Sequence, residues 1–382
     1  PTGSSLPEFN FTSKDLSARG SATLTSGKDL ATLELSQFKY LRNDFSLSYK
    51  KENGIQTVGI RGDTLDLSPL QDPGKPSKNP FTFFEKLNLQ ADIKHVSVGK
   101  GSDLQNVRGR ISCPADFCTF GEINGNTESG KPFSYRLTQT GGERKVSVQS
   151  DDAGQVLSAF DISDHMKGGK LDLKGTFLDN KPNRPLDGRV MITDFAVVKG
   201  PVMTKLLSLA SLTGFLDLLQ GKGISFKKLS ANFVLDGDTI SVGKGKAYGS
   251  ALGIMAEGDI NPFNHGRLDM KGTVVPSYTA NSLLGKIPLL GEALVGGKGE
   301  GLIAARFSVK GTSEDPSVSV NPLSLLTPGF LRNMFDVFDS PKSTRETPAG
   351  PQDGKSDPSS QAPQENTTVN AVPSRRDRKK RN

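Results

Sequence analysis

The chain has 382 residues with a net charge of +7 and a sequence pI near 9.2, and it contains no tryptophan. Much of the positive charge lies in residues 375–382, and the rest of the chain is close to balanced. A basic tail can hold nucleic acid or an anionic membrane surface, but we expect a solvated, disordered tail, with a membrane surface as the alternative and no nucleic acid as a partner. No signal peptide or clear transmembrane helix is apparent. Because the chain begins at Pro1, we expect a fragment or a processed chain; a membrane anchor of the parent protein would lie on the N-terminal side.

The first part of the chain alternates apolar and polar residues, which is the period-two pattern of half-buried strands. Asn53-Gly54 is a hairpin signal, and a second hairpin is expected around Gly141-Gly142. Residues 71–80 are rich in turn-forming residues and predict a loop. The predicted strands are Ser21–Thr25, Ala31–Leu41, Phe45–Tyr49, Val58–Leu67, Leu87–Val98, Leu104–Cys113, Phe133–Thr140 and Lys145–Gln149.

The two cysteines of the chain, Cys113 and Cys118, lie close together in the segment CPADFC. Two cysteines cannot complete the four ligands of a structural zinc site. A disulfide can close this short loop and would fit an oxidising compartment, whereas two free thiols are the alternative. We therefore hypothesise a disulfide between Cys113 and Cys118.

A short helix is predicted after residue 150. Ser150 is a good N-cap, and Asp151 and Asp152 in the first turn interact favourably with the helix dipole. Gly168-Gly169 is predicted to end this helix, because glycine adopts the left-handed conformation of helix ends. The apolar stripe of the helix consists of Val156, Leu157 and Phe160, and a strand over Lys170–Phe177 is predicted to follow.

A longer helix is predicted over Pro201–Gln220. Proline suits a first helical position, and Gly221 and Gly223 stop the helix. A transmembrane span has about this length, but Lys205 and Asp217 interrupt the apolar run. A buried helix that lies on a sheet is therefore the prediction.

Antiparallel strands that are apolar on one side follow this helix. Asp236-Gly237 predicts the tight turn between the first two of them. A register slip of one residue would turn every side chain to the opposite face, so the alternation alone does not say which face is buried. One face is predicted to carry Leu229, Ala231, Phe233, Leu235, Ile240, Val242, Leu252, Ile254, Leu268 and Met270.

A short motif occurs three times, as LDLKGT at Leu171–Thr176, LDMKGT at Leu268–Thr273 and FSVKGT at Phe307–Thr312. Two of the copies follow a Gly-Gly-Lys segment, at Gly168 and at Gly296. The predicted unit is a helix, a Gly-Gly turn, a strand and a Lys-Gly-Thr turn. Repeated units of this kind build elongated stacks in which each unit covers its neighbour.

No motif for catalysis stands out. Gly125–Lys131 has the spacing of a phosphate-binding loop, but Pro132 replaces the Ser or Thr that would bind magnesium, and a strand is expected next. His95, His165 and His265 lie far apart, and no serine or cysteine lies in a nucleophile-elbow context. The sequence therefore predicts no enzyme, no cofactor and no metal site.

The predicted fold class is mainly β, because apolar strand faces far outnumber the helices that could cover them. The sheet either folds back as a sandwich or curls into an open groove whose inner face meets an apolar partner, and the residue pattern leaves both possibilities open. Residues 340–382 are rich in Pro, Ser, Gln and charged residues, so they are predicted to be a disordered tail.

The second half of the chain resembles a known family. Residues 153–160 (AGQVLSAF) with 168–173 (GGKLDL), and 201–212 (PVMTKLLSLASL) with 223–226 (GISF), are similar to the AsmA-like C-terminal domain. The pattern of the YhdP-type members of the AsmA family is completed by 275–278 (VPSY), 281–285 (NSLLG), 287–291 (IPLLG) and 315–322 (DPSVSVNP). The resemblance covers about residues 150–335, and before residue 150 only the general strand rhythm is similar.

This resemblance implies an elongated, twisted antiparallel β-groove built of repeats, with a few short helices. Such proteins are anchored in the inner membrane of Gram-negative bacteria by an N-terminal helix and carry phospholipids through the periplasm towards the outer membrane. The strand residues named above would then line the groove and contact acyl chains. The implied organisation is a β-rich repeat region at 1–149, an AsmA-like C-terminal region at 150–339 and the tail at 340–382.

A rival hypothesis from another class is a periplasmic scaffold that assists outer-membrane protein assembly. In that case the open edge of the sheet would pair with a strand of the client protein. The presence or absence of phospholipid in the purified protein distinguishes the two hypotheses.

A last amphipathic helix is predicted over residues 327–339. Thr327 is a good N-cap and Pro328 a good first helical residue. The helix either caps the open end of the groove or docks, together with the basic tail, on a membrane surface or a partner. Its apolar face consists of Phe330, Leu331, Met334, Phe335 and Phe338.

Overall fold

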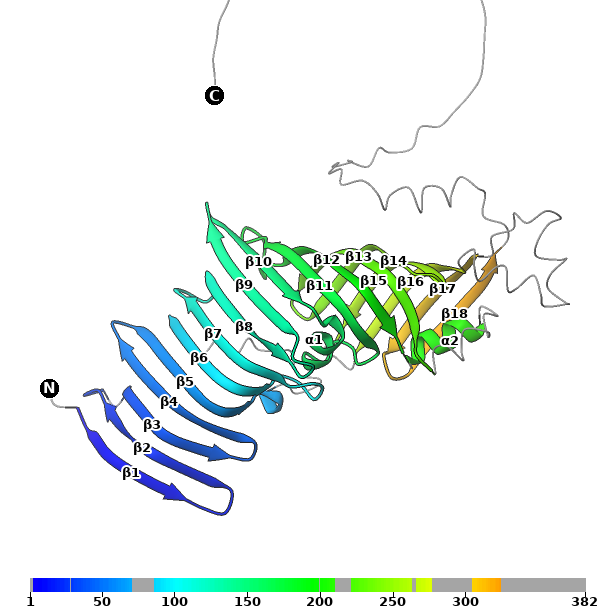
Figure 1. Cartoon of the computed structure of the whole chain (residues 1–382). Coiled ribbons are helices and arrows are strands. Elements are labelled where there is room, and N and C mark those ends of the chain that lie inside the picture. Colours follow the sequence, from blue (N-terminus) through cyan, green and yellow to red (C-terminus); the bar gives the residue numbers. More distant parts are fainter. Residues whose placement is uncertain are drawn as a thin grey trace, which may run out of the picture. The chain divides into compact units, whose positions relative to one another are not determined.

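The computed structural model describes residues 3–27, 29–70, 86–198, 200–209, 221–262, 266–276 and 304–323. All of them belong to one of the two units into which the chain divides, Pro1–Leu331. They form one sheet of 18 strands that is joined by two α-helices and a 3-10 helix (Figure 1). The prediction of a mainly β protein is therefore confirmed.

The strands follow one another along the chain. The first nine are β1 (Ser5–Thr12), β2 (Leu16–Leu24), β3 (Leu30–Tyr40), β4 (Asn43–Glu52), β5 (Ile55–Asp66), β6 (Leu87–Ser97), β7 (Leu104–Cys113), β8 (Phe120–Thr127) and β9 (Pro132–Thr140). The other nine are β10 (Glu143–Ser150), β11 (Met166–Phe177), β12 (Leu186–Val197), β13 (Ile224–Asp236), β14 (Thr239–Tyr248), β15 (Leu252–Asn261), β16 (Arg267–Pro276), β17 (Ala304–Thr312) and β18 (Pro316–Leu323). The 3-10 helix η1 (Ser68–Leu70) follows β5, α1 (Ala153–Ala159) follows β10, and α2 (Pro201–Leu209) follows β12.

Each strand pairs with the strands before and after it in the sequence, and almost all pairs are antiparallel. The exception is the parallel pair of β5 and β6, in which Val58 lies beside Leu89. The sheet is therefore mixed, and the prediction of an antiparallel sheet was wrong here. A parallel pair requires a long connection that returns the chain to its starting edge, and residues 67–86 separate these two strands.

The sheet is open among the described residues. There, β1 pairs only with β2, and β18 pairs only with β17. The pairing continues without a break through residue 150, because β10 pairs with both β9 and β11. The loop predicted for residues 71–80 lies outside the described residues.

The register divides the sheet into two chemically different faces, because partners on neighbouring strands point to the same side. One row of partners crosses all 18 strands, and every member is apolar or glycine. We call this set the apolar row and its side of the sheet the apolar face. The apolar row is Leu6, Ala22, Leu33, Tyr49, Val58, Leu89, Ile111, Gly121, Leu137, Val146, Gly175, Gly188, Phe233, Val242, Gly258, Met270, Val309 and Val318.

The opposite side of the sheet, which we call the polar face, carries charged and hydroxyl side chains. Its composition follows from the period-two alternation, since residues between two members of the apolar face point the other way. A row of partners from β2 to β13 illustrates it: Ser21, Glu34, Ser48, Gly59, Gln90, Arg110, Glu122, Arg136, Ser147, Lys174, Arg189 and Asn232.

Glycines on the apolar face make room for large side chains of neighbouring strands. A Cβ on Gly188 would lie 2.6 Å from Cζ of Phe233, and a Cβ on Gly272 would lie 2.5 Å from Cζ of Phe307. On Gly272 the same Cβ would also collide with the backbone oxygen of Met255. The aromatic rings thus fill the space above the glycines, and this close approach depends on the missing side chain.

Replacing Gly272 by alanine is therefore expected to lower the free energy of unfolding by about 1.5 kcal/mol, because a backbone atom must move to admit the methyl group. Urea denaturation measures the change. Gly243→Ala is the matched control, since nothing lies within 4 Å of a Cβ at that strand position. Equal stability of the two variants would contradict this account of the glycine.

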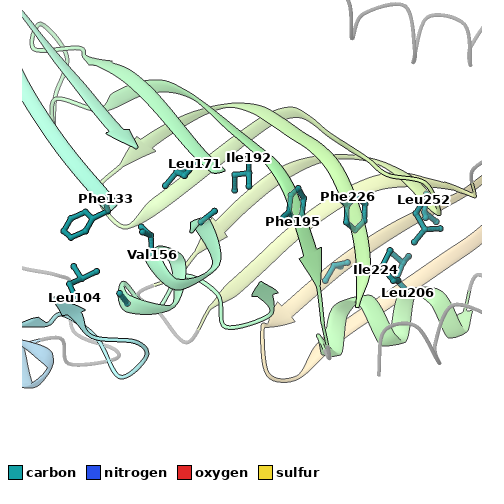
Figure 2. Close-up of a cluster of buried hydrophobic side chains, with 14 of the residues drawn as sticks. Leu104, Phe133, Val156, Leu171, Ile192, Phe195, Leu206, Ile224, Phe226 and Leu252 are labelled. Atoms are coloured by element: carbon teal, nitrogen blue, oxygen red, sulfur yellow. The ribbon is translucent and has the colours of Figure 1, made fainter. Parts of the chain in front are cut away.

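The helix α1 lies on the apolar face and begins one residue after its N-cap, Asp152. The Asp152 carboxylate accepts a hydrogen bond from the backbone N–H of Gln155. Ser150, which was predicted as the N-cap, is instead the last residue of β10, where its hydroxyl donates to the backbone oxygen of Pro132. Val156 is buried against the sheet (Figure 2), and α1 packs on β11 and β12.

The predicted end of this helix was wrong. The helix ends at its C-cap Phe160, which is 37% exposed and not part of a buried stripe. Gly168 and Gly169 lie inside β11, with φ values of 63° and 90°. Their positive φ angles serve an irregular start of this strand, for which glycine is as suitable as it is for a helix end.

The helix α2 begins with Pro201 as predicted and is described up to Leu209; the predicted continuation to Gln220 lies outside the described residues. Leu206 belongs to the same core as Leu252 (Figure 2). Lys205 Nζ donates to the backbone oxygen of Pro316 at 2.7 Å, so α2 is joined to the start of β18. Neither described helix is long and apolar enough to span a membrane.

The repeated motif occupies strands. Its first and second copies lie wholly within β11 and β16, and its third copy ends β17. The prediction of a Lys-Gly-Thr turn was therefore wrong for the first two copies. Gly175 and Gly272 in these copies face Gly188 and Phe307 on the neighbouring strands, so the glycine serves packing on the apolar face.

Candidate functional site

The apolar face is the candidate functional site, because it extends across the entire described sheet. Among the described residues, Arg144 is the only charged residue that is buried. The other charged side chains of the strands lie mainly on the polar face or near strand ends. A continuous surface of mainly apolar side chains suits an apolar ligand.

The structure brings the predicted lining residues together on the apolar face. Register pairs Leu235 with Ile240 and Phe233 with Val242. Phe233 and Leu252 are buried, and the remaining members are half-buried. The set on this face comprises Leu229, Ala231, Phe233 and Leu235 in β13, Ile240 and Val242 in β14, Leu252 and Ile254 in β15, and Leu268 and Met270 in β16.

Cover of the apolar face differs along the sheet. Around the helices, residues such as Leu207 and Val274 are completely buried. On β1, by contrast, Leu6 is 51% and Phe11 is 52% exposed, and Leu33 on β3 is half-buried. The helices pack mainly on β11, β12 and β18, so among the described residues the apolar face of β1–β4 has no extensive helix cover.

Arg144 at the start of β10 introduces one charge on the apolar face, and its neighbours neutralise it. Its Nε donates to both carboxylate oxygens of Asp179, at 3.0 and 2.9 Å, and its Nη1 donates to the backbone oxygen of Cys118 at 3.1 Å. The guanidinium also lies 4.1 Å from the ring centroid of Phe177 and 4.8 Å from that of Phe117. Two rings and a carboxylate thus enclose the buried cation.

The loop after β7 is closed by a disulfide between Cys113 and Cys118. Phe117 of this loop also contacts Arg184, whose guanidinium pairs with Asp116 at 3.0 Å. Because Arg184 lies in the turn between β11 and β12, the disulfide loop is joined to a turn that is distant in sequence. The contact between Phe117 and Arg184 lies at the strand end where β9 turns into β10, beside Arg144.

Two groups at this place have shifted pKa values. The Arg144 guanidinium, through its hydrogen bond, holds the pKa of the Asp179 carboxyl below its ordinary value. Burial raises the pKa of the Tyr135 hydroxyl. Both shifts move the pKa further from neutral pH, so this part of the apolar face keeps a constant charge near neutral pH.

The remaining motifs assemble no chemistry in the described residues. The glycine-rich segment Gly125–Lys131 spans the end of β8 and the turn into β9, so no helix follows it to hold a phosphate. His95 lies in β6 and His165 precedes β11, whereas His265 lies outside the described residues. No group of three His, Cys, Asp or Glu side chains within the described ranges could hold a metal ion.

No protein-family model, curated protein or solved structure matches the chain.

The Arg144 cluster was not predicted from the sequence, although a signal for it exists. Arg144 has the same strand parity as Val146 and Val148, so the alternation places it on the apolar side of β10. The partners Asp179 and Phe117 come from turns and follow no period. The helix predicted over 327–339, with Phe330, Leu331, Met334, Phe335 and Phe338, and the tail 340–382 lie outside the described residues.

Proposed function

We propose that this chain binds the acyl chains of phospholipids on its apolar face and lets them move along it. In this proposal it is the periplasmic part of a bridge that is anchored in the inner membrane and carries phospholipids towards the outer membrane. The observation that carries the proposal is the apolar row, which has no charged member on any of the 18 strands.

The length of the row favours a path over a pocket for a single lipid. Strands spaced about 4.8 Å apart make a row of this kind about 80 Å long. An acyl chain that fills half of a bilayer core reaches about 15 Å. Several lipids could therefore occupy the face one after another.

The energetics of the face favour movement. Each CH₂ group that leaves water for an apolar surface contributes about 0.8 kcal/mol. Because the row has no charged member that would hold or repel a lipid, we expect low barriers between neighbouring positions. The head groups would remain in water beside the sheet, and no nucleotide or cofactor is needed in this chain.

The disulfide supports the proposed compartment. Cys113 and Cys118 are bonded in a loop that also contacts other parts of the fold. Structural disulfides form and persist in oxidising compartments such as the bacterial periplasm.

A charge placed on the apolar face tests the proposal. Ile254 is half-buried and points to this face, whereas its neighbour Met255 points to the polar face. Ile254→Asp is expected to lower the phospholipid that purifies with the protein severalfold, because an unpaired carboxylate would lie among acyl chains. Mass spectrometry of the lipid extracted from detergent-free protein measures this amount.

Met255→Asp is the matched control and should leave the lipid content unchanged. Phe233 is less suitable for this test because it is buried against Gly188, so an aspartate there would unfold the sheet locally. A wild-type protein without phospholipid, or equal lipid loss in the two variants while both stay folded, would refute the proposed function.

The scaffold hypothesis depends on a free sheet edge, and β1 provides one among the described strands. However, Pro7 has no N–H to donate, and the register of β1 shifts between Leu6 and Phe9. Both features shorten the stretch that could pair with a client strand. The edge of β1 therefore favours this second function less than the apolar face favours lipid binding.

A further inference from the structure

The polar face carries a hollow of about 620 Å³ over β1–β6 that the lipid proposal does not use. Small residues line its middle, among them Ser46, Ser48 and Gly59. They leave space because neighbouring positions on this face carry long side chains. A Cβ on Gly59 would lie 2.5 Å from the hydroxyl oxygen of Ser48, so the glycine keeps this space open.

Four charged side chains line the same hollow: Glu8, Arg19, Glu34 and Arg61. No described residue forms an ion pair with any of the four. Charged residues on neighbouring strands behave differently, since Lys94 pairs with Asp63 at 2.7 Å and Arg108 with Asp92 at 3.4 Å. Unpaired charges of both signs are thus gathered around one hollow.

The geometry keeps these charges apart while directing them to a common space. Ser46 faces Arg61 across the β4–β5 pair, and Ser48 faces Glu34 across the β3–β4 pair. Arg19 on β2 and Arg61 on β5 are three strand spacings apart, which is about 14 Å between the backbones. Long side chains from the two sides can therefore reach a ligand that lies over the serines.

We propose that this hollow binds a zwitterion, a small molecule or head group that carries an ammonium and an oxyanion. The planar guanidinium groups of Arg19 and Arg61 match the two oxygens of a phosphate or carboxylate. The carboxylates of Glu34 and Glu8 accept hydrogen bonds from the ammonium. The lining charges sum to zero, so a ligand with only one charge would leave groups of like sign unsatisfied.

Calorimetric titration of the folded chain with phosphoethanolamine tests this site. Its two halves, ethanolamine and inorganic phosphate, are the comparison probes. Phosphoethanolamine is expected to bind at least about tenfold more tightly than either half, because only the zwitterion engages both kinds of side chain. β-Alanine, which has a carboxylate in place of the phosphate, should also bind.

Variants separate the two halves of the site. The double variant Arg19→Gln, Arg61→Gln should bind phosphoethanolamine about tenfold more weakly or worse. Glu34→Gln should bind phosphoethanolamine no more tightly than inorganic phosphate. Arg189→Gln is the matched control, because Arg189 is exposed on the same face but lies on β12, outside this hollow. It should leave binding unchanged.

A binding experiment with lipid vesicles identifies the source of the zwitterion. Flotation with phosphatidylethanolamine vesicles that depends on Arg19 and Arg61 assigns the ligand to lipid head groups, whereas binding of the free probes alone assigns it to soluble zwitterions. If inorganic phosphate binds as tightly as phosphoethanolamine, or if no probe binds, the proposal is wrong. Because the hollow lies opposite the apolar face, neither result changes the lipid content measured with Ile254→Asp.

Discussion

Replacing Arg144 by alanine is expected to lower the free energy of unfolding by about 3 kcal/mol, a loss typical of breaking a buried ion pair. The side chain of Arg144 is 5% exposed and bonded to Asp179 and the backbone oxygen of Cys118. Its removal leaves the Asp179 carboxylate and that oxygen without their donor, and the rings of Phe117 and Phe177 without the cation between them. Urea denaturation at pH 7 measures the loss.

The pH dependence of this effect has a defined sign. The folded-state pKa of Asp179 is lowered by Arg144, so the stabilisation is present above the ordinary carboxyl pKa and is lost as pH falls through the folded value. The difference in stability between wild type and Arg144→Ala should therefore narrow below about pH 4.

Arg136→Ala is the matched control, because Arg136 also pairs with an acid, Glu122, but its side chain is 65% exposed. Exposed pairs of this kind contribute about 0 to 1 kcal/mol. Adding Asp179→Asn to the Arg144→Ala variant should recover part of the stability, since it removes the unpaired charge. Similar losses of stability for Arg136→Ala and Arg144→Ala would show that burial of the guanidinium does not determine the size of the loss.

Removing the disulfide, as the double variant Cys113→Ser and Cys118→Ser, is expected to cost about 2 kcal/mol. Closing a short loop restricts the unfolded chain, and the entropy of that restriction gives a value of this size. The loop also positions Phe117 beside Arg144, so the two features should be coupled. Arg144→Ala should therefore destabilise the serine variant less than it destabilises wild type.

Thiol labelling provides the independent measurement. Protein that is unfolded without reductant should show no reactive thiol, and both cysteines should react after reduction. Complete labelling before reduction would show that the disulfide is absent from the protein. The support that the disulfide gives to a periplasmic location would then be lost as well. Additive effects of the two substitutions would show that the loop and Arg144 act separately.

The composition of the two faces could be predicted from the sequence, because strand parity is a local property. Leu229 lies between Lys228 and Ser230 in the sequence, and the register places Leu229, Phe233 and Ile254 on the apolar face. The prediction failed where glycine has several uses. Gly168-Gly169 suits a helix end and an irregular strand equally well, and Gly175 suits a turn as well as a close approach of two strands.

Alternation within a few residues is enough to predict that the protein is mainly β and that each strand has one apolar side. That these sides align into one row over 18 strands could not be predicted, because the alignment depends on pairings between residues far apart in the chain. The same holds for the parallel pair of β5 and β6, for the enclosure of Arg144 by Asp179 and Phe117, and for the hollow between Arg19 and Arg61. Each of these joins groups from separate strands or turns, and no local period connects them.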